Sequence, residues 1–184
     1  MNKKLAVLLL SLVATAATLA VAGSDPIVGG HEMFPTKNII QNAVNSDDHT
    51  TLVAAVKAAG LVDTLQGPGP FTVFAPTNEA FAKLPAGTVD TLLKPENKDM
   101  LTKILTYHVV AGRISASDLK KEIKAGNGEA SLKTVSGGTL TATIQGTRIV
   151  LRDEKGDMST VTISNVNQSN GVIHVVDTVL LPNE

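Results

Sequence analysis

Side chains that could act as acids, bases, nucleophiles or metal ligands are few and scattered in this chain of 184 residues. The absence of cysteine excludes disulfides, thiolate metal sites and a cysteine nucleophile. The four histidines stand singly, with none of the spacings of a zinc site, so we expect no metal. They are His31, His49, His108 and His174.

One pair of side chains could be considered as an acid-base pair for catalysis. His174 and Asp177 are three residues apart in a run that reads as a strand, and this spacing places them on opposite faces. No Gly-x-Ser-x-Gly turn accompanies them. The Gly-x-Gly sequences at residues 67–69 and 126–128 lack the strand-to-helix context of a nucleotide loop. We therefore predict no catalytic residue and no cofactor, and rank an enzyme third among the function classes.

Composition excludes a further class of partner. The formal net charge is −1, from 16 Lys and Arg against 17 Asp and Glu, and the chain has four Phe, one Tyr and no Trp. Phosphate binding needs a concentrated basic surface, and base stacking needs aromatic platforms. A nucleic-acid partner is therefore not expected.

The N-terminus has the pattern of an export signal. Lys3 and Lys4 precede an uncharged apolar run over residues 5–22, which ends in small residues. The run is near the lower length limit of a membrane helix, so an uncleaved anchor is the alternative. We predict a cleavable signal peptide at 1–22, a flexible leader without hydrophobic periodicity at 23–35 and one domain at 36–184. No later run is long enough to span a membrane.

Hydrophobic spacing divides the domain into a helical and a strand-rich part. Over residues 36–105 apolar residues recur at helical spacing, with Thr36 as an expected N-cap, Asp48 before a second helix that Gly60 ends, and a third helix that starts near Pro95. The apolar face of this third helix is expected to hold Met100, Leu101, Ile104 and Leu105. From residue 130 the period becomes two, with turn residues between the runs. This order predicts an α+β fold with an antiparallel sheet.

Two segments interrupt this division. Residues 71–75 read as a strand inside the helical part, left through Pro76, and Thr77 can cap a short helix over 78–82. Residues 171–181 are apolar on both alternating faces, which is typical of a central strand covered on both sides. We expect the two segments to pair or lie close together in the core, with Phe71, Phe74 and Phe81 buried there.

These segments carry a resemblance to a known family. FTVFAPTNEAF at 71–81 resembles the first signature of the fasciclin-like domain, NGVIHVVD at 170–177 resembles the second, and LTYHVV at 105–110 is similar to its Tyr-His motif. The resemblance covers about residues 38–182 and implies a twisted, antiparallel-rich β-sheet wedge with a cluster of α-helices packed on it. The signature positions are Phe71, Phe74, Pro76, Thr77, Phe81, Asn170, Gly171, His174 and Asp177.

The resemblance also nominates binding residues. In eukaryotic relatives the Tyr-His motif is implicated in integrin binding, which points here to Tyr107 and His108 with Val109 and Val110 beside them. The alternative is that Tyr107 is packed with its hydroxyl paired and His108 bonds a backbone carbonyl. A second motif of those relatives, Asp-Ile, corresponds to Asn165 and Val166, where the acid is replaced by an amide.

The leading hypothesis is an exported, monomeric, non-enzymatic adhesion or interaction module. It would bind a protein or glycan at the cell surface, in the periplasm or in the extracellular matrix through a broad polar face. The alternative is a small-molecule or lipid carrier in the periplasm, with an apolar cleft between helices and sheet as its site.

Overall fold

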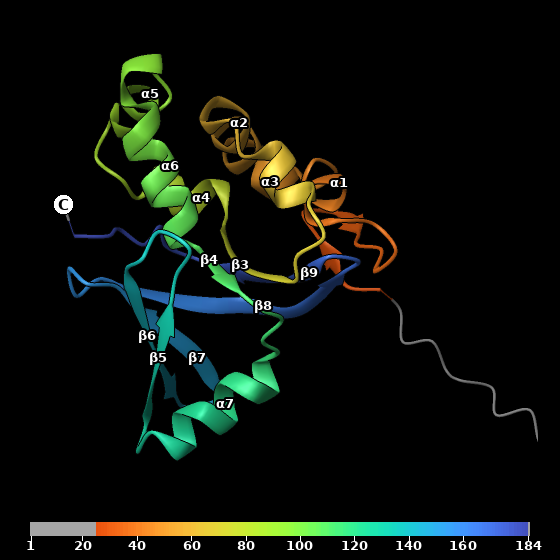
Figure 1. Cartoon of the computed structure of the whole chain (residues 1–184), viewed down its shortest axis with the longest axis vertical. Helices are drawn as coiled ribbons and strands as arrows, with labels where there is room; N and C mark the ends of the chain where they lie inside the picture. Colours follow the sequence, from red (N-terminus) through yellow and green to blue (C-terminus); the bar gives the residue numbers. More distant parts are fainter. Residues whose placement is uncertain (1–24, 184) are drawn as a thin grey trace, which may run out of the picture.

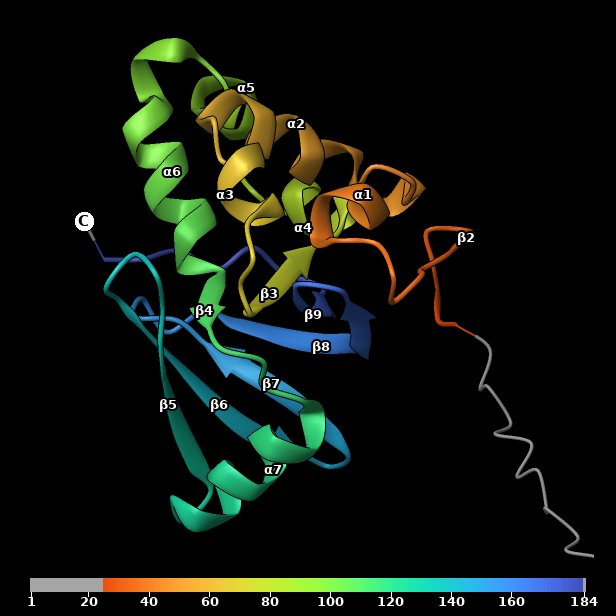
Figure 2. The same cartoon turned by 45° about the vertical axis from the view of Figure 1, so that its right-hand side comes forward.

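The computed structural model describes residues 25–183. The expected signal peptide lies outside these residues. A group of helices packs on one side of a strongly curved sheet, and one further helix, α7, lies on the other side (Figures 1 and 2). The helices are α1 (Ile39–Ala43), α2 (Thr50–Ala59), α3 (Val62–Gln66), α4 (Asn78–Ala82), α5 (Thr88–Leu92), α6 (Lys98–Tyr107) and α7 (Ala116–Ala125), with 3₁₀ turns at Asp47–His49 and Pro95–Asn97.

The main sheet has seven strands in the order β4-β3-β9-β8-β7-β6-β5. The pair β3 and β9 is parallel, and the other neighbours are antiparallel. The sheet curls until its two edges approach each other. Val110 forms a β-bridge with Thr134, and the Val135 N–H donates to the Val109 carbonyl (2.8 Å). The strands are β3 (Phe71–Pro76), β4 (Val109–Ala111), β5 (Glu129–Lys133), β6 (Thr139–Gln145), β7 (Arg148–Arg152), β8 (Met158–Gln168) and β9 (Gly171–Val176).

The parallel pair forms the centre of the fold. Its register runs from Phe71 opposite Gly171 to Pro76 opposite Val176, which confirms the expectation that the two segments pair. All of β9 is buried. The apolar run in the sequence extends to residue 181, but β9 ends at Val176, and residues 177–183 lie outside the sheet.

Alternation along β3 and β9 divides the interior into two cores. Val73 and Val175 face the helical layer, whereas Phe74 and Val176 face the inside of the curled sheet. There they meet Tyr107, Leu140 and Leu151, together with Leu119 and Ile123 of α7. The α+β fold class is confirmed. Phe74 and Phe81 are buried as expected, and Phe71 is partly buried against the helical core.

Helix starts differ in detail from the sequence expectation. Asn38, not Thr36, caps α1: its side chain accepts the Gln41 N–H, and the Gln41 side chain accepts the Asn38 N–H. Thr77 caps α4 as predicted, accepting the Ala80 N–H (3.2 Å). Met100 was expected on the buried face of α6 but is 54% exposed, because it lies at the edge of the apolar stripe.

The start of α2 is held from outside the helix. No side chain in the turn before it makes a capping bond. Instead Asn78 of α4 accepts the Thr51 N–H (3.0 Å) and donates to the Asp47 carbonyl (2.8 Å). A residue of the first signature therefore joins α4 to α2.

Two further elements differ from the expected organisation. Helix α7 lies between β4 and β5, in a part of the chain where the sequence division predicts no helix. The leader, expected to be loose, forms a small hairpin of β1 (Ile27–Val28) and β2 (His31–Glu32). Val28 and Met33 are buried in the helical core, so the described part of the leader packs on the domain.

Candidate binding surface

The two residues nominated by the Tyr-His motif point into the protein. Tyr107 is fully buried at the end of α6, where its hydroxyl donates to the Thr139 carbonyl (2.8 Å) and accepts the Glu154 N–H (3.1 Å). Burial raises the pKa of Tyr107 to about 12. The hydroxyl thus joins α6 to the start of β6 and to the turn after β7. This geometry agrees with the packing interpretation.

His108 is 2% exposed and has both ring nitrogens occupied. The Leu180 N–H donates to Nε2 (3.0 Å), so Nε2 carries no proton, and Nδ1–H donates to the Ile104 carbonyl (2.9 Å). Burial lowers the pKa of His108 to about 4, although the Ile104 carbonyl partly opposes this shift. The ring is therefore a neutral link between α6 and the C-terminal segment.

The flanking apolar candidates are also internal. Val109, Val110 and Val166 are each at most 5% exposed and belong to the two cores. Contact of these side chains with a partner would require the sheet to open.

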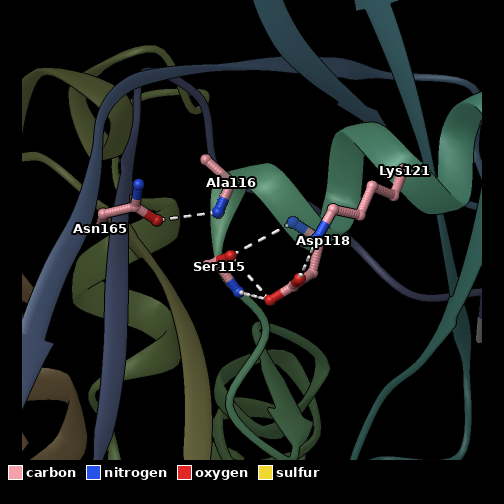
Figure 3. A network of polar contacts seen from close by, with 5 residues as sticks. All are labelled: Ser115, Ala116, Asp118, Lys121 and Asn165. Atoms are coloured by element: carbon pink, nitrogen blue, oxygen red, sulfur yellow. Dashed lines mark hydrogen bonds and ion pairs between the residues drawn. The ribbon is translucent and has the colours of Figure 1, made fainter.

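Asn165 is the exposed member of the nominated set. It lies in β8 where the register with β9 shifts between Ile163 and Val166, and its φ is +59°. Its Oδ1 accepts the Ala116 N–H (2.8 Å) at the start of α7, beside the capping box of Ser115 and Asp118 (Figure 3). The amide at this motif position therefore anchors α7 to the sheet.

This role predicts a graded stability series. Asn165→Gly keeps the left-handed backbone but loses the acceptor, so the free energy of unfolding should fall by about 1 kcal/mol. Asn165→Ala also strains the backbone, and about 2 kcal/mol is expected. Asn165→Asp keeps an oxygen at the helix N-terminus and should stay within about 0.5 kcal/mol of wild type. Urea denaturation followed by far-UV circular dichroism measures all three. An alanine variant as stable as the glycine variant would contradict the backbone argument.

A surface groove of about 320 Å³ lies beside α7. Arg113, Ile114, Asp118, Lys121 and Glu122 line it, and we call it the α7 groove. Arg113 Nη2 donates to the Gln168 carbonyl (2.8 Å), which fixes the groove to the end of β8. The Lys121 ammonium lies 3.5 Å from the Asp118 carboxylate, whose pKa is lowered mainly by hydrogen bonds from Ser115 (Figure 3). The α7 groove thus offers exposed groups of both charges.

Sequence reasoning missed the α7 groove because it missed α7. The signal was present: Ser115 and Asp118 have capping-box spacing, and Leu119 and Ile123 follow at helical spacing.

His174 and Asp177 are not brought together as an acid-base pair. His174 is fully buried against Phe74, with Nε2–H donating to the Ile114 carbonyl (2.9 Å) and Nδ1 accepting the Asn165 N–H (3.3 Å). Burial lowers its pKa. The Asp177 carboxylate instead accepts the Thr160 N–H (2.8 Å). Each side chain satisfies separate backbone groups.

Residues 25–183 contain no group of three or more His, Asp or Glu arranged to hold a metal ion. Within the same residues, every helix falls short of the length and apolar character needed to cross a membrane.

The Fasciclin domain family model matches residues 47–182. The chain belongs to this family. The resemblance inferred from the three motifs is thereby confirmed. The leader hairpin and α1 precede the matched residues of the fasciclin domain.

Several relatives of this fasciclin domain come from bacteria. Protein sll1483 of Synechocystis is 50% identical over 144 residues, which cover 78% of this chain and 73% of the relative. Immunogenic protein MPB70 of Mycobacterium bovis is 39% identical, with 90% of each chain covered. Cell surface glycolipoprotein MPB83 of the same species is 38% identical over 76% of this chain and 58% of its own.

A solved structure supports the fold. A FAS1 domain pair from the insect cell adhesion molecule fasciclin I superposes with a TM-score of 0.69 at 20% identity, covering 79% of this chain and 51% of that one. At this identity the likeness concerns the fold alone.

The second signature of this fasciclin domain serves its structure. Asn170 accepts the Ile39 N–H (3.0 Å) and donates to the Leu65 and Gly67 carbonyls (2.7 and 2.8 Å). A Cβ at Gly171 would lie 2.1 Å from the Phe71 carbonyl oxygen, so the parallel pair requires glycine there. These residues tie the helical layer to the sheet.

Proposed function

We propose that this fasciclin domain is an exported, monomeric, non-enzymatic interaction module that binds a protein or glycan at the cell surface or in the surrounding matrix. The observation that supports this most is the α7 groove, an open groove lined by the exposed charged side chains of Arg113, Lys121 and Glu122. Two comparisons give further support, because one relative is named a cell surface glycolipoprotein and the structural neighbour comes from a cell adhesion molecule.

The α7 groove is favoured over the motif residues for a physical reason. Tyr107 and His108 have all their polar atoms occupied inside the protein. Lys121 and Glu122 are exposed, and their charges can be complemented by a partner without unfolding any element. Such paired charges govern partner choice and association rate more than raw affinity.

Charge reversal tests the surface. We expect the double variant Lys121→Glu, Glu122→Lys to bind an envelope fraction of its own source cells at least about tenfold more weakly, because complementary charges become repulsive. Cosedimentation at low and physiological salt measures the affinity.

Lys120→Glu is the matched control, since Lys120 is exposed on the same helix but does not line the α7 groove. It should bind like wild type. Equal binding by the double variant and wild type would place the contact elsewhere and overturn the proposal for the α7 groove. Treating the envelope with protease or with periodate before the assay then separates a protein partner from a glycan.

A further inference from the structure

Two asparagines of the chain are followed directly by glycine, in the pairs Asn127–Gly128 and Asn170–Gly171. In such a pair the backbone nitrogen of the glycine can attack the side-chain amide carbon of the asparagine, because glycine has no Cβ to obstruct the approach. The reaction also needs an asparagine side chain that is free to turn toward that nitrogen. The fold therefore decides which of the two pairs can react.

The side chain of Asn170 is held in place. It accepts the Ile39 N–H (3.0 Å) and donates to the Leu65 and Gly67 carbonyls (2.7 and 2.8 Å), and the residue is 7% exposed. To approach the Gly171 nitrogen, its amide carbon would have to give up these bonds between the helical layer and the sheet. Asn170 is therefore protected while the domain is folded.

Asn127 lies in the turn that leads from α7 to β5 (Figure 1). Both Asn127 and Gly128 are exposed, and a Cβ at Gly128 would meet no atom within 4 Å beyond its neighbours in the chain. The φ of Asn127 is +57°, the left-handed conformation that asparagine adopts where a helix ends. The surroundings of this pair leave room for the side chain to turn.

One hydrogen bond restrains the attacking nitrogen. The Gly128 N–H donates to the Ile123 carbonyl (2.8 Å), as in a Schellman motif at the end of a helix. The nitrogen can attack only while this bond is open. The bond belongs to the helix end, where residues 124–129 are all exposed, and such ends open at little cost in free energy. It therefore protects Asn127 far less than the three side-chain bonds protect Asn170.

We propose that Asn127 is a site of spontaneous covalent modification, at which water converts the side-chain amide to an acid through a cyclic imide. The Gly128 nitrogen bonds to Cγ of Asn127, the Cγ–Nδ2 bond breaks, and the proton of the Gly128 nitrogen leaves with the amide group as ammonia. Water then opens the ring. Cleavage of the bond between nitrogen and Cγ gives aspartate, and cleavage of the bond between nitrogen and the backbone carbonyl carbon gives isoaspartate.

Both products change the end of α7. Each adds a negative charge beside the helix C-terminus, where the helix dipole disfavours it. Isoaspartate also lengthens the main chain before Gly128 by one carbon atom, which misaligns the Gly128 N–H with the Ile123 carbonyl. The last turn of α7 should then open more often. This inference does not depend on the proposed function, because Asn127 does not line the α7 groove.

Peptide mass spectrometry of the full chain, incubated folded at pH 8 and 37 °C, tests the proposal. Cleavage after lysine releases residues 125–133, in which Asn127 is the sole asparagine, whereas Asn170 falls within residues 156–184. Conversion of amide to acid should be at least about tenfold faster at Asn127 than at Asn170. Isoaspartate, detected by enzymatic methylation, should appear in residues 125–133. The rate should rise with hydroxide concentration, because the attacking nitrogen must lose its proton.

Two controls separate the fold from the local sequence. In urea both pairs are exposed, so Asn127 and Asn170 should react at similar rates. Asn127→Gly keeps the left-handed backbone without the reactive amide, so residues 125–133 should stay unmodified while the rate at Asn170 is unchanged. The effect on α7 is measured by hydrogen exchange at the Gly126 N–H, which donates to the Glu122 carbonyl (2.9 Å) and should exchange faster in the isoaspartate form.

Two results would overturn the proposal. The first is an equal rate at Asn127 and Asn170 in the folded chain, which would mean that both react only after unfolding. The second is unmodified Asn127 after an incubation that converts most of it in urea, which would mean that the bond to Ile123 blocks the attack. Unchanged exchange at Gly126 in the isoaspartate form would contradict the expected opening of α7.

Discussion

Replacing His108 with alanine is expected to lower the free energy of unfolding by about 4 kcal/mol. The substitution leaves the Leu180 N–H without its acceptor in a buried position, removes the bond to the Ile104 carbonyl and creates a cavity. An unpaired buried donor costs roughly 1–3 kcal/mol, and the lost packing of a large buried side chain adds a similar amount. Urea denaturation followed by circular dichroism measures the change.

Two variants test the cause. His108→Gln keeps a donor and an acceptor and should recover part of the loss. His31→Ala removes an exposed histidine and should change stability by less than about 0.5 kcal/mol. A loss below about 1 kcal/mol for His108→Ala would mean that the C-terminal segment does not depend on this ring.

The second large effect is a loss of stability in mild acid. His108 has a folded pKa of about 4 against an unfolded value of 6.5, so the unfolded chain binds more protons between these pH values. The histidine contribution is therefore fully present above pH 6.5 and is lost as the pH falls toward 4. His108 alone should account for about 3 kcal/mol. His49 and His174, whose pKa values burial also lowers, act in the same direction.

Unfolding free energies measured at intervals between pH 8 and pH 4 test this expectation. In His108→Gln the slope should be shallower, because that side chain does not titrate. Asp118 and Glu154 also have lowered pKa values, but carboxylates lose their contribution below their own unfolded values, at lower pH. A wild-type profile that stays flat from pH 6.5 to 4.5 would show that the buried histidines do not limit stability.

The sequence predicted those parts of the fold whose signals are local. The strand at residues 71–75, its exit through Pro76 and the cap at Thr77 lie within a few residues of one another, and the structure has all three. Gly60 ends α2 with a φ of +73°, as a left-handed terminal glycine does. The pairing of β3 with β9 followed from apolar character on both faces, which only a central strand retains.

The remaining features depend on distant contacts. The inward direction of Tyr107 and His108 is set by Thr139, Glu154 and Leu180, which are 32 to 72 residues away along the chain. The role of Asn165 likewise depends on a distant contact, because its side chain binds the start of α7. That helix lies between the helical and the strand-rich parts of the sequence and was not predicted. The spacing of residues along the sequence could not show which of the nominated binding residues would be buried in the core.

The central place of β9 has a consequence for the order of folding. This strand is the last one within residues 25–183, yet it lies between β3 and β8, and its partner in β3 is about 100 residues earlier. Pairing across such a separation requires costly loop closure and slows folding. Residues 25–170 can be synthesised completely while the sheet still lacks β9, the strand that joins β3 to β8. The newly made chain therefore cannot complete its sheet until the C-terminal strand β9 is available.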